Sequence, residues 1–254
     1  LHLCDRRQRQ MCIRDRSSIE VKENSTILDV AKKISEGLAR VATCGEIDGE
    51  VKDLRYEITK DCNLTIHTFD SSLDGKKAYW HTTSHIMAQA VKRLFPGVKF
   101  AIGPSIDNGF YYDFDVEKPF TDEDKEKIEA EMKKIIKENL PIERFVLPKD
   151  EALKLMEGQP YKQELINDLP EGEEIGFYKQ GDFTDLCAGP HLVSTGKVKA
   201  IKILSSSGAY WRGDEHNKML QRIYAISYPK ASQLEEYLPV SYTHLRAHET
   251  VLDL

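Results

Sequence analysis

The chain has 254 residues, a formal net charge of −6 at pH 7, and 40% hydrophobic and 31% charged residues. No apolar run reaches the roughly 18 residues that span a bilayer, which excludes a transmembrane protein and indicates a soluble one with one large or two smaller domains. The five cysteines form no CxxC pair, so we expect no disulfide framework and a reducing, cytoplasmic location. The acidic balance excludes a surface that binds nucleic acid everywhere but allows a local pocket for one nucleic-acid end.

The two ends of the chain show no usable period of apolar residues. Residues 1–18 gather five arginines, and residues 239–254 show no capping or helical pattern. Both stretches resemble translated adapter sequence, so we expect non-native or disordered flanks at 1–18 and 239–254. A genuine disordered tail at each end is the alternative.

The block 19–72 predicts a small α+β domain. Thr26 and Asp29 fit a capping box at a helix start, and Asp48-Gly49 tolerates the positive φ of a type I′ hairpin turn. We expect, in chain order, a strand at 19–21, a helix at 26–38, a hairpin at 46–51 and a strand at 64–68. This order predicts one sheet with one helix on one face.

The block 73–238 predicts a larger α+β domain, entered through a polar linker at 70–77. Its apolar spacings predict helices packed on a mostly antiparallel sheet. We expect helices at 81–95, 121–140, 149–157 and 160–168, and strands at 99–102, 110–115, 175–179, 197–204 and 219–228.

Two histidines open the first helix of this block. His81 and His85 are four residues apart and lie on one side of an α-helix. The apolar residues of the helix form a face nearly opposite to them: Ile86, Met87, Ala90, Val91 and Leu94. We therefore expect the pair to point away from the core, and two readings stay open, a functional pair and two packed core histidines.

A second cluster lies far downstream in Cys187-Ala-Gly-Pro-His191. The Gly-Pro step breaks a helix, which favours a loop that aims a thiol and an imidazole at one point. With His81 and His85 the loop gives three histidines and one cysteine, a set that suits tetrahedral zinc. The alternative is a packed thiol with a surface histidine. Thr82 stands where a zinc protease needs Glu, and no P-loop, GxSxG or GxGxxG occurs, so zinc proteolysis, phosphate cradling and serine hydrolysis have no support.

Five segments in fixed order carry a family resemblance. They are His81-Thr-Thr-Ser-His85, Ala101-Ile-Gly-Pro-Ser-Ile-Asp-Asn-Gly-Phe-Tyr-Tyr-Asp113, Asp185-Leu-Cys-Ala-Gly-Pro-His191, Gly208-Ala-Tyr-Trp-Arg-Gly-Asp214 and Asn217-Lys-Met-Leu-Gln-Arg-Ile-Tyr224. Together they resemble the N-terminal half of bacterial threonyl-tRNA synthetases over most of 19–238. Gly37-Leu-Ala39 and Ile47-Asp-Gly-Glu-Val51 add a likeness to the TGS module. The resemblance implies a ubiquitin-like β-grasp TGS domain at 19–72 and, at 73–238, the editing domain shared with alanyl-tRNA synthetases.

The resemblance also implies a function. Threonine and serine differ by one methyl group, which is worth only about 1–3 kcal/mol of discrimination, so serine is attached in error and must be removed. The family's editing pocket deacylates seryl-tRNA(Thr) at its 3′ end. The ligase core, with its ATP and zinc, belongs to the parent enzyme, since the likeness stops after about Leu238. Alternatives are a zinc-dependent alanyl-type trans-editing deacylase and a non-catalytic TGS module that binds RNA.

Seven pocket residues follow from the resemblance, position by position. The catalytic group would be His81, His85 and Lys162, with His81 and Lys162 activating the water. Substrate-binding residues would be Tyr112, Asp185, Cys187 and His191. Asp185 would hold the serine ammonium or hydroxyl, Tyr112 would exclude the methyl of threonine, and His85, Cys187 and His191 would shape the pocket around the ribose. We expect no required metal, with His81, His85, Cys187 and His191 as the zinc set otherwise. The expected partner is the tRNA(Thr) 3′ end, with no membrane; the parent enzyme would be a homodimer, whereas this chain could be a monomer.

Overall fold

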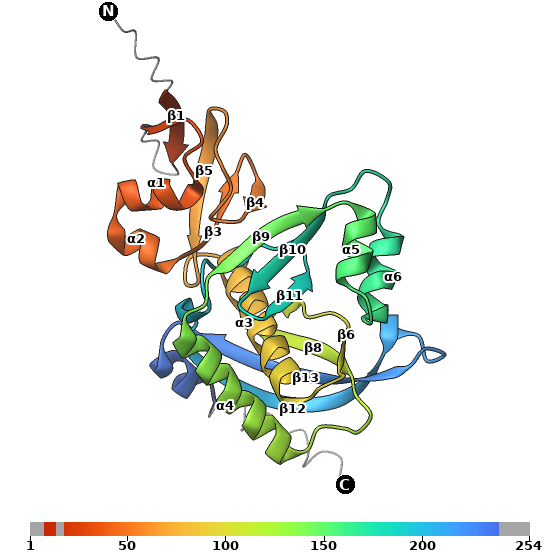
Figure 1. Ribbon diagram of the computed structural model, residues 1–254. Coiled ribbons are helices and arrows are strands. Elements are labelled where there is room, and N and C mark those ends of the chain that lie inside the picture. Colours follow the sequence, from red (N-terminus) through yellow and green to blue (C-terminus); the bar gives the residue numbers. More distant parts are fainter. Residues whose placement is uncertain (1–7, 14–17, 239–254) are drawn as a thin grey trace, which may run out of the picture.

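The computed structural model describes residues 8–13 and 18–238, which form two α+β domains (Figure 1). The α+β prediction is thereby confirmed. The first domain is a five-stranded sheet in the order β2-β1-β5-β3-β4, with two short helices. Its elements are β1 (Gln8–Ile13), β2 (Ser18–Lys22), α1 (Ile27–Ile34), α2 (Glu36–Val41), β3 (Ala42–Ile47), β4 (Glu50–Lys52) and β5 (Cys62–Thr68).

Local signals in the first domain worked where a side chain satisfies the backbone. The capping box is present, with Asp29 N donating to Thr26 Oγ1 and Thr26 N donating to Asp29 Oδ2. Asp48 (φ 50°) and Gly49 (φ 91°) make the expected turn between β3 and β4. The single helix predicted over 26–38 is wrong. The Ser35 side chain accepts from Leu38 N and starts a second helix, because serine favours caps over helix interiors.

The expectation that residues 1–18 lie outside the fold differs from the structure. Residues 8–13 form β1, which pairs antiparallel with β2 and parallel with β5, and β2 begins at Ser18. Two neighbouring strands supply the backbone hydrogen bonds that apolar periodicity does not reveal. The rest of that flank (1–7 and 14–17) and the expected flank 239–254 lie outside the described residues, and the non-native origin of both flanks stays a prediction.

The second domain has two antiparallel sheets, in the orders β12-β13-β8-β6, with β7 paired to β8, and β11-β10-β9. Its elements are α3 (Leu73–Leu94), β6 (Lys99–Phe100), β7 (Ser105–Ile106), β8 (Gly109–Asp115), α4 (Asp122–Glu138), β9 (Ile142–Leu147), α5 (Lys149–Leu155), α6 (Pro160–Asp168), β10 (Ile175–Gln180), β11 (Phe183–Leu186), β12 (Ala200–Tyr210) and β13 (Met219–Tyr228). Helix α3 lies at the centre, packed on β8 and β13, beside α4 and against β11 (Figure 1).

Helix α3 begins earlier than predicted, so most of the expected linker at 70–77 is helical. Ser72 caps it by accepting from Gly75 N. Gly75 has no room for a side chain, since a Cβ there would lie 2.0 Å from the Thr68 carbonyl oxygen of β5. Among the described residues, no helix combines the length and apolar character needed to cross a bilayer.

The expectation that the histidine pair points away from the core is wrong for His85 and holds in part for His81. His85 is only 3% exposed, whereas His81 keeps part of its surface open. The apolar side of α3 packs into the core as expected, with Ile86 and Met87 fully buried. The opposite side meets β11 and the loop that follows it, and a periodicity argument cannot see that second cover.

Candidate active site

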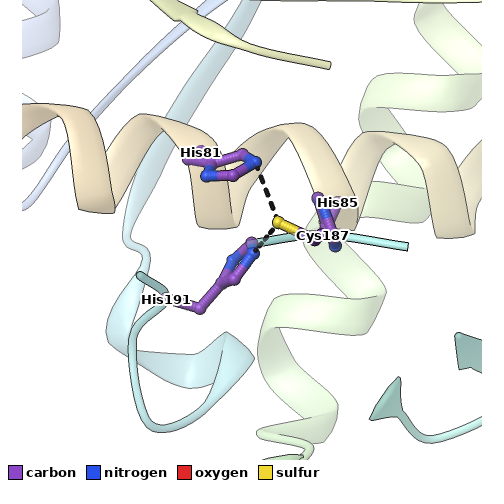
Figure 2. A group of neighbouring side chains, drawn as sticks. All are labelled: His81, His85, Cys187 and His191. Carbon is purple, nitrogen blue, oxygen red and sulfur yellow. Dashed lines mark hydrogen bonds between the residues drawn. The ribbon is translucent and has the colours of Figure 1, made fainter. Parts of the chain in front are cut away.

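Three histidines and one cysteine meet beside α3 (Figure 2). One nitrogen of His81, His85 and His191 and the Cys187 sulfur all lie within 4.8 Å of one another. The Cys187 Sγ is 3.3 Å from His81 Nε2 and 3.1 Å from His191 Nε2. The structure therefore brings together both pairs that the sequence singled out.

The loop that carries Cys187 and His191 is held mainly through its backbone. The Cys187 N–H donates to the Gly176 carbonyl of β10, and a Cβ on Gly176 would lie 2.9 Å from the Cys187 carbonyl oxygen. The Leu192 N–H donates to Thr82 Oγ1 on α3. Thr82, the residue that ruled out a zinc protease, thus ties the loop to the histidine helix.

A buried polar network adjoins the cluster. Lys162 Nζ on α6 lies 2.6 Å from Asp185 Oδ1, and the Tyr112 hydroxyl donates to Asp185 Oδ2 at 2.6 Å. His85 Nε2 lies 3.7 Å from the same oxygen. Because both carboxylate oxygens of Asp185 have partners, the residue links the amine, the phenol and one imidazole.

Burial sets the protonation of the cluster. It lowers the pKa of His81 to about 3, with a contribution from His85, and lowers the pKa of His85 to about 3, with a contribution from Lys162. The pKa of His191 is also lowered well below its usual value, mainly by burial. Burial raises the pKa of the Cys187 thiol to about 12. Near pH 7 the imidazoles are neutral and the thiol is protonated.

A pocket of about 390 Å³ opens onto this cluster. Five of the seven predicted site residues line it: His81, His85, Lys162, Asp185 and Cys187. The remaining two, Tyr112 and His191, are fully buried behind that lining. A Cβ on Gly103, which also lines the pocket, would lie 2.1 Å from the Tyr112 ring. One wall of the pocket is therefore the Gly103 backbone with the Tyr112 ring directly behind it.

Known proteins resemble both halves of the chain. Residues 175–224 match the threonyl and alanyl tRNA synthetase second additional domain, and residues 11–68 match the TGS domain. A threonine–tRNA ligase of Acetivibrio thermocellus is 64% identical over 231 residues, and one of Caldanaerobacter subterraneus subsp. tengcongensis is 62% identical over 228. The chain therefore contains a TGS domain followed by a threonyl and alanyl tRNA synthetase second additional domain. The alignments cover 90% and 89% of this chain but 36% and 35% of those relatives, so the chain spans about a third of their length.

The second additional domain offers a donor set that fits zinc in type and spacing. Ligand atoms around tetrahedral zinc, bound at about 2.0–2.3 Å, lie roughly 3.3–3.6 Å apart. The two Sγ–Nε2 distances, 3.3 and 3.1 Å, are close to that range. One feature is less suited to zinc, since the buried His191 Nδ1 has no hydrogen-bond partner among the residues that the structure describes. Metal-bound histidines normally donate their second N–H to an acceptor.

Three residues near the site had not been singled out from the sequence. Asp53 and Arg55 of the TGS domain bond to the loop that carries His191, and Tyr178 of β10 packs against the His191 ring and bonds to Asp53. Asp53-Leu-Arg55 looks like an ordinary polar turn, and Tyr178 looks like a core residue of a predicted strand. No sequence signal could have found them, because the hydrogen bonds that link Asp53 and Arg55 to this region span more than 120 positions of the chain.

Proposed function

We propose that this chain deacylates seryl-tRNA(Thr), hydrolysing the ester between serine and the terminal ribose, without a required metal. The observation that carries the proposal is the pocket where the neutral His81 imidazole, the Cys187 thiol and the buried Lys162–Asp185 pair meet. Two comparisons support the proposal. The relatives are named threonine–tRNA ligase, which points to tRNA(Thr), and the second additional domain is one found in threonyl and alanyl tRNA synthetases.

Serine is the expected target because the parent enzyme cannot reject it by binding alone. One methyl group separates it from threonine, which gives about 1–3 kcal/mol of discrimination. A second pocket that admits serine and excludes the extra methyl raises the overall selectivity. We assign that exclusion to the wall formed by Gly103 and the Tyr112 ring behind it, whose close fit leaves no free volume.

In the proposed reaction a water molecule attacks the ester carbonyl carbon. The new C–O bond forms, the bond from that carbon to the ribose oxygen breaks, and the proton released by the water ends on the ribose hydroxyl. His81 is neutral near pH 7 and accepts a hydrogen bond from the water. Because its pKa is lowered to about 3, its part is to orient the water more than to remove a proton fully.

The cation of Lys162 stabilises negative charge on the carbonyl oxygen in this reaction. A buried ammonium acts in a medium of low dielectric constant, where it is worth more than in water. Asp185 holds the ammonium in place at 2.6 Å and, through lone pairs that its present partners leave, could also accept from the serine ammonium. His85 packs beside His191, with ring centroids 4.3 Å apart, and completes the pocket.

Cys187 serves as a neutral thiol and not as the nucleophile. The thiolate is the reactive form of cysteine, and a pKa of about 12 leaves very little thiolate near pH 7. Were zinc bound by His81, His85, Cys187 and His191, it would supply Lewis-acid polarisation of the ester. The steps described here use the chain's own residues only.

The test is deacylation of seryl- and threonyl-tRNA(Thr) by the purified chain and by its His81→Ala variant. We expect the chain to release serine much faster than threonine, and His81→Ala to abolish that release with the fold intact. His216→Ala is the matched control, since His216 is an exposed histidine outside the pocket. Full activity in His81→Ala would contradict the proposed role.

The same assay separates the alternatives. Binding of tRNA without ester hydrolysis would favour a non-catalytic RNA-binding module built on the TGS domain. Hydrolysis of seryl-tRNA(Ala), stoichiometric zinc in the purified protein and loss of activity on chelation would favour a zinc-dependent alanyl-type deacylase. ATP-dependent ligation and a homodimer are proposed for the longer parent enzyme, because this chain spans about 36% of its relatives.

A further inference from the structure

The TGS domain reaches the candidate active site through two residues that follow β4. Asp53 is 9% exposed and has a short bridge to Arg55, with Arg55 Nη1 2.6 Å from Asp53 Oδ1. The Arg55 backbone N–H also donates to that oxygen, at 2.9 Å. The pair is thus preorganised within its own turn and points toward the second additional domain.

Both residues bind the backbone around His191. Asp53 Oδ2 accepts from the His191 N–H at 3.2 Å, and Arg55 Nη2 donates to the Leu192 carbonyl at 2.7 Å. Arg55 Nη1 makes a longer contact of 3.4 Å with the His191 carbonyl. Asp53 therefore accepts a hydrogen bond from the loop and Arg55 donates one to it. Together the two bonds hold the backbone on both sides of His191 in place.

Asp53 also acts on the loop through Tyr178. The Tyr178 hydroxyl donates to Asp53 Oδ2 at 3.2 Å, and its ring lies 4.3 Å from the His191 ring. A Cβ on Gly189 would lie 2.2 Å from the Tyr178 hydroxyl oxygen, so the loop turns closely over this side chain. Asp53, Tyr178 and His191 form one packed group that backs the Cys187 sulfur.

We propose that Asp53 and Arg55 are positioning residues for the hydrolytic reaction, so that the TGS domain forms part of the editing site. The inference rests on the proposed function for its kinetic test only. Asp53 and Arg55 do not line the pocket. They act by holding the buried His191 in place and, through its 3.1 Å contact with the sulfur, the pocket-lining Cys187.

The physical basis is the buried Asp53 carboxylate, which accepts from both the His191 N–H and the Tyr178 hydroxyl. Removing its charge leaves the His191 N–H and the Tyr178 hydroxyl facing an amide that offers donors of its own. The loop would then shift or become mobile. A misplacement of about 1 Å at a reacting centre can cost roughly a hundredfold in rate.

The kinetic test compares the full chain with Asp53→Asn, Arg55→Gln and the matched control Lys52→Gln. Lys52 ends β4 directly before Asp53 and pairs with exposed Glu50. We expect kcat for seryl-tRNA(Thr) to fall roughly tenfold to a hundredfold in the first two variants, with KM within about twofold. Lys52→Gln should keep both constants. Unchanged kcat in folded Asp53→Asn and Arg55→Gln would overturn the proposal, as would a loss confined to KM.

A second measurement needs no activity. Hydrogen exchange at the Cys187 and Leu192 amides, which donate to Gly176 and Thr82, reports the order of the loop without touching Asp53 directly. Both amides should exchange faster in Asp53→Asn and Arg55→Gln, while the amide of Val30 in α1 stays protected. Unchanged exchange at the loop amides would overturn the positioning role even if the unsubstituted chain proves inactive. Inactivity of the unsubstituted chain itself would instead refute the proposed function.

Discussion

The Lys162 ammonium lies 2.6 Å from the Asp185 carboxylate, and both residues are 3% exposed or less. A buried ion pair of this kind must offset the cost of removing two charges from water, and its value depends on both partners being present. The pair therefore matters for stability as well as for the chemistry of the pocket.

Lys162→Met should destabilise the chain by about 3–5 kcal/mol, because it leaves the Asp185 charge buried without its cation. Urea unfolding at pH 7 measures the loss. The double variant Lys162→Met/Asp185→Asn should lose less than the single variant, and Lys127→Met, which breaks an exposed pair with Glu123, should lose far less. If Lys162→Met were as stable as the unsubstituted chain, the result would contradict the buried ion pair.

Cys187 should react slowly with iodoacetamide. Its thiol pKa of about 12 implies a thiolate population at pH 8 roughly a thousandfold below that of a free cysteine. Peptide mass spectrometry of the Cys187 fragment gives the rate, with glutathione as the reference thiol. In single turnover, no serine should be found attached to the protein. A rapid reaction or a trapped thioester would make Cys187 a nucleophile and refute the neutral-thiol role.

The chain should lose stability as the pH falls below about 6.5. His85 has a pKa of about 3 in the folded chain against a usual 6.5, so the unfolded state binds more protons between these values and is favoured by acid. The contribution of His85 between pH 6.5 and 4.5 should be up to about 2–3 kcal/mol. Urea unfolding of the unsubstituted chain and of His85→Gln at both pH values isolates the contribution of His85 to the free energy of unfolding. Equal acid sensitivity in the two proteins would contradict the shift.

Gly103→Ala should destabilise the chain by about 1–3 kcal/mol, since the new methyl group would overlap the Tyr112 ring at 2.1 Å. It should also reduce hydrolysis, because Gly103 lines the pocket. Gly37→Ala is the matched control, with only the Ser35 hydroxyl oxygen nearby at 3.6 Å, and should be neutral or slightly stabilising. Thermal unfolding measures the stability and serine release measures the hydrolysis. Equal behaviour of the two variants would contradict the close contact between Gly103 and the Tyr112 ring.

Local physics explains which parts of the fold could be predicted. The capping box at Thr26 and the turn at Asp48-Gly49 are decided by side chains a few residues away, and the structure has both. Helix α6 and strand β13 were predicted within their observed bounds, 160–168 and 219–228. The split of α1 and α2 at Ser35 shows the reverse, since a second cap overrides a continuous apolar period.

The candidate site divides in the same way. The sequence could name the two histidine-bearing segments, because each is a compact pattern, and the structure brings their side chains within 4.8 Å. It could not show that His85 is buried, because that depends on β11 and the following loop packing on the other side of α3. Nor could it reveal Asp53 and Arg55, whose partners are backbone groups of another domain. The roles of the individual residues stay predictions.

Helix α3 joins the two domains more closely than the boundary at 72/73 suggests. Phe69, at the end of the TGS domain, packs edge-on against Tyr79, Trp80 and Tyr228, with ring centroids 5.0, 5.8 and 5.6 Å apart. Cutting the chain at this boundary would separate Phe69 from the other three rings and expose apolar surface on both fragments, which favours aggregation. A protein engineer who wants either domain alone would therefore first have to replace the aromatic side chains that join them, on both sides of the cut.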